Sequence, residues 1–161
     1  MVREGDIKIF ESGAMLIYIG EKDERILPSA PVDGMRAFSW LFAALNTIEP
    51  VFFELSNVSI FSADQEWAKL RRPGLLESIG ARLDGLVGAL SDQSCLTGSF
   101  SIADIAMSTM LREARDTDLV FSRPTLAAYV QRCIERPAFE RAMAAQLRPF
   151  ARGPGNPSWA S

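Results

Sequence analysis

The sequence predicts a mainly α-helical bundle of at least five helices, preceded by a short extended segment. Apolar side chains recur every three and four residues through most of the chain beyond Met35, which is the period of an amphipathic helix. Pro124 and Pro137 each precede such a stripe, where a first-turn proline loses no backbone hydrogen bond. At 161 residues, the chain is long enough for one domain that buries roughly 70% of its unfolded surface.

Composition excludes several functions. The chain has no histidine, which rules out His-based serine and cysteine triads, the HExxH metal site and most zinc sites. The net charge is −3 and the basic residues are scattered, so we expect no nucleic-acid partner. No stretch approaches the roughly 20 apolar residues of a membrane span. Cys95 and Cys133 form no CxxC motif and indicate reduced thiols in a cytoplasmic protein without metal.

The first segment is ambiguous from pattern alone. The alternating run Ile7–Phe10 meets a turn-like Glu11-Ser12-Gly13, and the apolar run Ala14–Ile19 follows. Ile17, Tyr18 and Ile19 favour strands, so a hairpin of two strands and a strand followed by a helix are both possible.

Two long helical stripes follow. The first begins at Met35, with a kink expected at Pro50 and a turn over residues 57–64; its members are Phe38, Leu41, Phe42, Leu45, Ile48, Phe52 and Leu55. The second runs from Leu76 to Leu90. Pro73-Gly74 interrupts its N-terminal part, so a separate short helix around Trp67 and Leu70 is a second possibility.

The stretch "GSFSIAD" predicts the start of a third helix, Ile102 to about Glu113. Ser101 and Asp104 fit a capping box, in which each side chain accepts from the other residue's backbone N–H. Removing this cap should cost about 1 kcal/mol, and more if the helix is buried. We therefore interpret Asp104 as structural and not catalytic. Further helices are expected from Pro124 and Pro137, and residues 151–161 should form a loose tail.

Four motifs together carry a resemblance to a known family. "FSIADI" is followed about thirty residues later by "RPAF", behind a long kinked helix, and this resembles the C-terminal domain of glutathione S-transferases. "IFESGAMLIYIGEKDERILPS" resembles the end of the family's thioredoxin-like N-terminal domain, with Leu27-Pro28 at the linker position. The resemblance implies a thioredoxin-fold remnant at 1–27, with strand Ile7–Phe10 and helix Ser12–Lys22, and an all-α domain at 28–150.

The resemblance also implies a role for Glu11 and Ser12, because this pair holds the γ-glutamyl end of glutathione in the family. A helix N-terminus offers free N–H groups to a carboxylate, and Glu11 could accept from the ligand's ammonium group. The alternative is that Ser12 is an N-cap and Glu11 an acid favourable to the helix dipole. No residue matches the family's thiol-activating Tyr, Ser or Cys, so no catalytic residue is assigned.

Trp40 and Phe53 lie off the main stripe and are candidates for an apolar co-substrate pocket or an interface, while Arg71-Arg72 is more consistent with solvated surface. The expected function is that of a glutathione S-transferase family protein that conjugates glutathione to a small electrophile in its full form, with negligible activity in this chain. The alternative is a non-catalytic dimerisation or ligand-binding module. Unpaired apolar strand edges favour a homodimer in either case.

Overall fold

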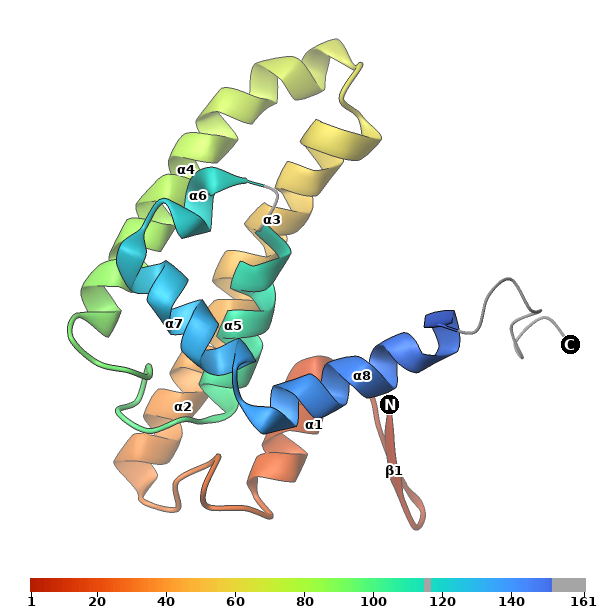
Figure 1. Cartoon of the computed structure of the whole chain (residues 1–161), viewed down its shortest axis with the longest axis vertical. Coiled ribbons are helices and arrows are strands. Elements are labelled where there is room, and N and C mark those ends of the chain that lie inside the picture. The colour runs from red at the N-terminus through yellow and green to blue at the C-terminus, as the bar shows by residue number, and fades with distance from the viewer. Residues whose placement is uncertain (115–116, 152–161) are drawn as a thin grey trace, which may run out of the picture.

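The computed structural model describes residues 1–114 and 117–151. It opens with an antiparallel hairpin of β1 (Val2–Glu4) and β2 (Ile7–Ile9), in which Val2 pairs with Ile9. Gly5 takes a positive φ of 55° in the two-residue turn, a conformation open to glycine. All the other regular elements of the described chain are helices, so the predicted mainly α fold is confirmed (Figure 1).

The second segment, α1 (Ser12–Gly20), decides between the two alternatives left open by the pattern. Ala14–Ile19 is helical, so a hairpin between this run and Ile7–Phe10 is wrong. The partner of β2 is instead the upstream Val2–Glu4, whose three residues are too short to stand out as a strand. Tyr18 connects α1 to the hairpin, because its hydroxyl donates to Glu4 Oε2 at 2.8 Å.

A long irregular helical segment follows. It comprises α2 (Pro31–Ala43), a π-helical turn η1 (Ala44–Ile48), α3 (Glu49–Ser56) and a second π-helical turn η2 (Asn57–Phe61). Pro50 stands in the first turn of α3, and the π-helical η1 precedes it directly. The turn expected over residues 57–64 is wrong for its first part, because η2 continues the helix to Phe61 and buries Val58.

The second long helix, α4 (Glu66–Leu90), is continuous through Pro73 and Gly74. The separate short helix is therefore wrong. Ala68 and Leu75 are both fully buried on either side of the proline, so packing against the bundle holds the two parts in one helix despite the missing N–H. In Figure 1, α4 runs alongside α3.

The remaining helices are α5 (Ile102–Glu113), a short α6 (Asp118–Phe121), α7 (Pro124–Ile134) and α8 (Pro137–Ala151). The starts of α5, α7 and α8 are as predicted, whereas α6 has too few residues to show a period. α5 lies in the core, packed on α2, η1 and α7. α8 extends from the bundle toward the side where the hairpin lies (Figure 1). The predicted loose tail falls almost wholly outside the described residues.

Candidate functional site

The N-terminus of α1 is exposed and has no side-chain cap. Glu11 is the residue before the first turn and makes no capping hydrogen bond, although its carbonyl accepts from Met15 N–H at 3.0 Å. The first backbone N–H groups of a helix have no partner within the helix, so those of the exposed Ser12 and Ala14 are available to a ligand, whereas Gly13 is buried. Both Glu11 and Ser12 are exposed beside them.

Glu11 also has an unusual backbone. Its φ of 67° lies in the left-handed region, which costs a non-glycine residue about 1–3 kcal/mol. Such strain persists where the surrounding structure imposes it and is concentrated at binding sites. A simple N-cap function for Ser12 is not what the structure shows, because Ser12 is already inside the helix and Glu11 occupies the cap position.

Two glycines hold α1 against the helical bundle. A Cβ on Gly13 would lie 2.8 Å from Leu45 Cδ1, and a Cβ on Gly20 would lie 2.9 Å from Leu27 Cβ and 3.1 Å from Ile102 Cγ2. The two glycines are seven positions apart, so they share one face of α1. The linker is tied down as well, since Ile102 N–H donates to Ile26 carbonyl oxygen at 2.8 Å. The Glu11 and Ser12 end is thus fixed relative to the bundle.

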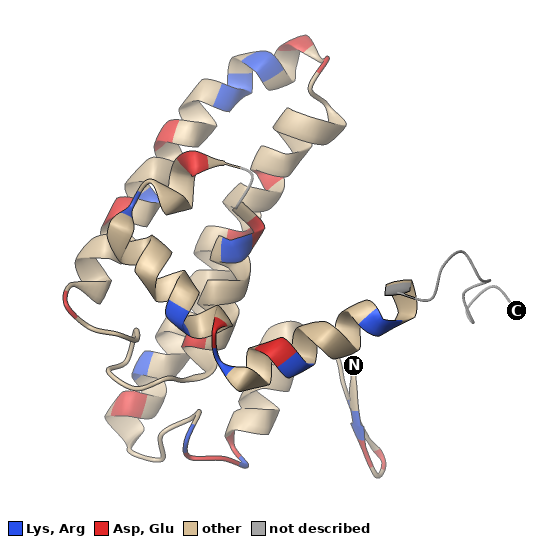
Figure 2. Ribbon diagram, viewed as in Figure 1, with Lys and Arg blue, Asp and Glu red and all other residues tan. Residues whose placement is uncertain are grey.

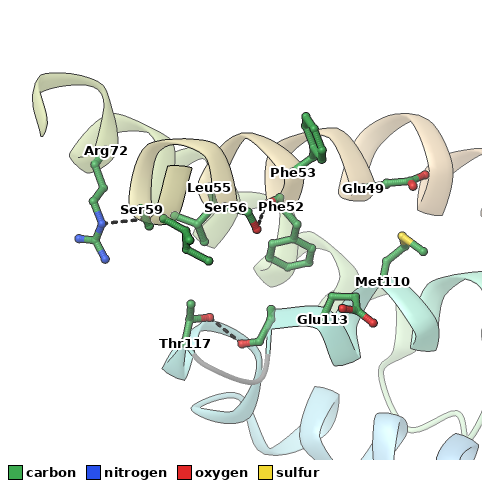
Figure 3. Close-up of a pocket in the computed structure, with 12 residues that line it drawn as sticks. Glu49, Phe52, Phe53, Leu55, Ser56, Ser59, Arg72, Met110, Glu113 and Thr117 are labelled. Atoms are coloured by element: carbon green, nitrogen blue, oxygen red, sulfur yellow. Dashed lines mark hydrogen bonds between the residues drawn. The ribbon is translucent and has the colours of Figure 1, made fainter. Parts of the chain in front are cut away.

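A cavity of about 420 Å³ lies between α3, η2, the start of α4 and the C-terminal end of α5 (Figure 3). Its wall is largely apolar. The lining residues are Glu49, Phe52, Phe53, Leu55, Ser56, Ser59, Ile60, Arg72, Met110, Glu113, Ala114 and Thr117. Phe52 belongs to the core and its ring points toward α5, whereas Phe53 is 73% exposed at the rim and its ring points away from Phe52 (Figure 3).

Most hydroxyl groups of this cavity are already engaged. Ser56 donates to the carbonyl oxygen of Phe52 at 3.1 Å, and Thr117 donates to that of Ala114 at 2.8 Å. Ser59 Oγ instead accepts from Arg72 Nε at 3.2 Å.

Trp40, the other predicted pocket residue, lies elsewhere. It is half-buried on α2 and lines a shallow surface hollow with Pro31, Val32, Met35, Arg36 and Ser39. The structure therefore places Phe53 and Trp40 in different cavities.

Ser101 and Asp104 form the capping box at the start of α5, and the structure shows more than a cap. Asp104 is fully buried, and its Oδ2 accepts from Ser101 N–H at 2.9 Å and from Ser101 Oγ at 3.0 Å. Its Oδ1 accepts from Leu96 N–H and from the Tyr129 hydroxyl, each at 2.9 Å. No local sequence pattern links Tyr129 to Asp104. A buried tyrosine needs a partner for its hydroxyl, which was the available signal.

The buried carboxylate affects its titratable neighbours. Burial, and next the charge of Asp104, raise the pKa of Tyr129 far above its usual range. The same causes raise the pKa of the Cys133 thiol to about 11, and burial raises that of Cys95. These thiols are therefore protonated near neutrality, and neither has the lowered pKa of a reactive cysteine.

Charge of both signs is distributed over the helices (Figure 2). Within residues 1–114 and 117–151, no group of three His, Cys, Asp or Glu side chains could hold a metal ion. No helix in the same residues is long and apolar enough to cross a membrane.

Comparison with known proteins identifies the family of the C-terminal helical part. Residues 60–137 match the family model described as glutathione S-transferase, C-terminal domain. The chain contains a glutathione S-transferase C-terminal domain. The fold agrees, because a glutathione transferase from Burkholderia graminis superimposes with a TM-score of 0.80 at 25% identity, over 90% of this chain and 65% of that one. No curated protein sequence matches the chain.

Two further solved structures share the fold. A glutathione transferase from Pseudomonas putida matches with a TM-score of 0.77 at 24% identity, over 92% of this chain and 64% of its own length. Ure2p5 from Phanerochaete chrysosporium matches with a TM-score of 0.79 at 21% identity, over 93% of this chain and 74% of its own. The chain thus spans about two thirds of the length of the bacterial transferases.

The bound molecules in these crystals are related to glutathione. The Burkholderia graminis structure holds two glutathione molecules per subunit, and that from Pseudomonas putida holds one glutathione disulfide per subunit. Ure2p5 was cocrystallised with 1-(S-glutathionyl)-2,4-dinitrobenzene.

Proposed function

We propose that the full protein is a cytoplasmic, dimeric glutathione transferase that conjugates glutathione to a small electrophile. In this proposal, Glu11 and Ser12 bind the γ-glutamyl end of glutathione at the N-terminus of α1. The ligand's α-carboxylate would accept from the free N–H groups and the Ser12 hydroxyl, and its ammonium group would donate to Glu11.

The observation that carries the proposal is the left-handed Glu11 directly before an exposed, uncapped helix N-terminus. The unbonded N–H groups at the start of α1 therefore lie next to a strained residue, and such strain is typical of ligand-binding sites. The glutathione bound in structures of the same fold supports this choice of ligand.

The electrophile would occupy the cavity that Phe53 lines. Its apolar wall suits an aromatic or aliphatic molecule, and Ure2p5 was crystallised with a conjugate that carries an aromatic ring of this kind. Conjugation joins the glutathione sulfur to an electrophilic carbon, so the thiol must first lose its proton. We assign that activation to none of the described residues, since the hydroxyl of Tyr18 is bonded to Glu4 and the Cys133 thiol is buried.

Calorimetric titration with glutathione tests the α1 site. We expect saturable binding that Ser12→Ala weakens and that Ser29→Ala, at an exposed serine of the linker, leaves unchanged. Because a hydrogen bond to a charged group contributes about 1.5–3 kcal/mol, the Ser12→Ala loss should be at least about tenfold. An absence of heat up to millimolar glutathione, or equal affinity in both variants, would refute the assignment of Ser12.

A second function, a non-catalytic dimerisation or ligand-binding module, is favoured by the surface near Trp40. Val32 and Met35 are 64% and 61% exposed there, and both line the same hollow as Trp40. Apolar side chains gathered in this way are typical of an interface. Light scattering at increasing protein concentration tests this. A dimer that Met35→Glu dissociates would support the module, whereas a monomer at high concentration would refute self-association.

A further inference from the structure

Arg71 and Arg72 are neighbours in sequence but have different partners. Arg71 makes a two-pronged ion pair with Glu54, with Nε 2.7 Å from Oε1 and Nη2 3.2 Å from Oε2. Arg72 forms no ion pair with any carboxylate in the part of the chain that is described, and only its Nε is used, on the hydroxyl of Ser59. Its two terminal nitrogens therefore remain available.

Arg72 is also the one basic side chain among the described residues that line the cavity. The carboxylates of the cavity, Glu49 and Glu113, lie toward the other end of the view in Figure 3. Glu113 is paired with Arg112 at 3.1 Å, whereas Glu49 is exposed. The cavity is thus polarised, with positive charge at the end formed by η2 and α4 and negative charge at the end formed by the start of α3 and by α5.

We propose that the cavity selects small molecules with an apolar, flat body and a carboxylate at one end, and that Arg72 is the residue that sets this preference. The apolar body would lie along Phe52 and Ile60, and the carboxylate would accept from the terminal nitrogens of Arg72. Glu49 would repel the opposite orientation. The inference deepens the proposed function by naming a class of co-substrate, and it rests on the assignment of this cavity to the electrophile.

Size and chemistry support this class. A cavity of about 420 Å³ is within the usual range of small-molecule sites, roughly 300–1,000 Å³. The planar guanidinium matches the two oxygens of a carboxylate and donates to both. Since Ser56 and Thr117 already donate to backbone carbonyl oxygens, Arg72 is the strongest donor that the described wall offers to an anion.

A pair of matched probes tests the preference. 4-Biphenylcarboxylate and its neutral amide have nearly the same shape, and their dissociation constants can be measured by calorimetry with the full chain. We expect the carboxylate to bind about fivefold more tightly, because an exposed charge pair contributes about 1 kcal/mol. Arg72→Gln should remove this difference and leave the affinity for the amide unchanged.

Arg71→Gln is the matched control, because it removes the same charge from the adjacent residue, which is held by Glu54 outside the cavity lining. It should keep the preference for the carboxylate. Ile60→Ala, at a residue that is 70% exposed, should weaken both probes without unfolding the protein.

Equal affinity of the wild-type chain for both probes would overturn the inference, as would a preference that survives in Arg72→Gln. If neither probe binds, the assignment of the cavity itself is wrong. Failure of the proposed function is distinguishable, because glutathione binding at Ser12 is measured in a separate titration that does not involve these probes.

Discussion

The buried carboxylate of Asp104 allows a sharp test by a one-atom change, Asp104→Asn. Each carboxylate oxygen accepts one backbone N–H, Oδ1 from Leu96 and Oδ2 from Ser101, and one hydroxyl, from Tyr129 and from Ser101 respectively. The hydroxyls can rotate to accept from an asparagine NH₂ group, but a backbone N–H cannot. In either orientation of the amide, one buried N–H therefore faces a donor.

The expected cost follows from this geometry. A buried donor left without an acceptor costs about 1–3 kcal/mol, and the remaining bonds lose the strengthening that a charged acceptor provides. We expect Asp104→Asn to lower the free energy of unfolding by about 2–4 kcal/mol. Tyr129→Phe should cost about 1 kcal/mol, because Oδ1 keeps the Leu96 N–H.

Urea unfolding followed by far-ultraviolet circular dichroism measures both variants and their double mutant. Because the two residues share a hydrogen bond, the double mutant should differ from the sum of the single changes by at least about 0.5 kcal/mol. The control is Asp92→Asn, at an exposed acid, which should change stability by less than about 0.5 kcal/mol. An Asp104→Asn effect as small as that of Asp92→Asn would show that the carboxylate network does not stabilise the fold as described.

Three further outcomes are expected. Gly20→Ala should destabilise the protein because the new Cβ overlaps neighbouring side chains, whereas Gly85→Ala, where a Cβ meets nothing within 4 Å, should stabilise it by about 0.5–1 kcal/mol. Pro73→Ala should raise the free energy of unfolding by about 1 kcal/mol or more, since α4 is continuous there and regains a hydrogen bond. At pH 8 a disulfide reagent should modify the half-exposed Cys95 slowly and Cys133 only on unfolding.

Each of these has a contradicting result. Equal melting temperatures for the two glycine variants would refute the close packing of α1 on the bundle. A Pro73→Ala variant less stable than the parent would mean that the proline constrains the unfolded chain more than it disturbs the helix. Modification of both thiols at one rate in the native protein would contradict the burial of Cys133.

The raised pKa of the Cys133 thiol also makes stability depend on pH. Its contribution to the free energy of unfolding is present below pH 9, the ordinary pKa of the thiol, and is lost as the pH rises toward 11.

The sequence determined the class of fold and the first residues of several helices. The starts at Ile102, Pro124 and Pro137 follow from local chemistry, since a capping box and a first-turn proline act within a few residues of the chain. The absence of histidine excluded whole classes of catalysis before any contact was known. The motif around Glu11 and Ser12 led to a binding hypothesis that stays a prediction.

Tertiary structure decided what depends on packing across the chain. It kept α4 continuous through Pro73, because buried residues on both sides hold the helix to the core. It gave Asp104 a distant partner in Tyr129, which no local pattern specifies. It also separated Arg71 from Arg72: one meets Glu54 on a neighbouring helix and the other faces a cavity. Two adjacent arginines have different partners because successive residues of a helix point in different directions.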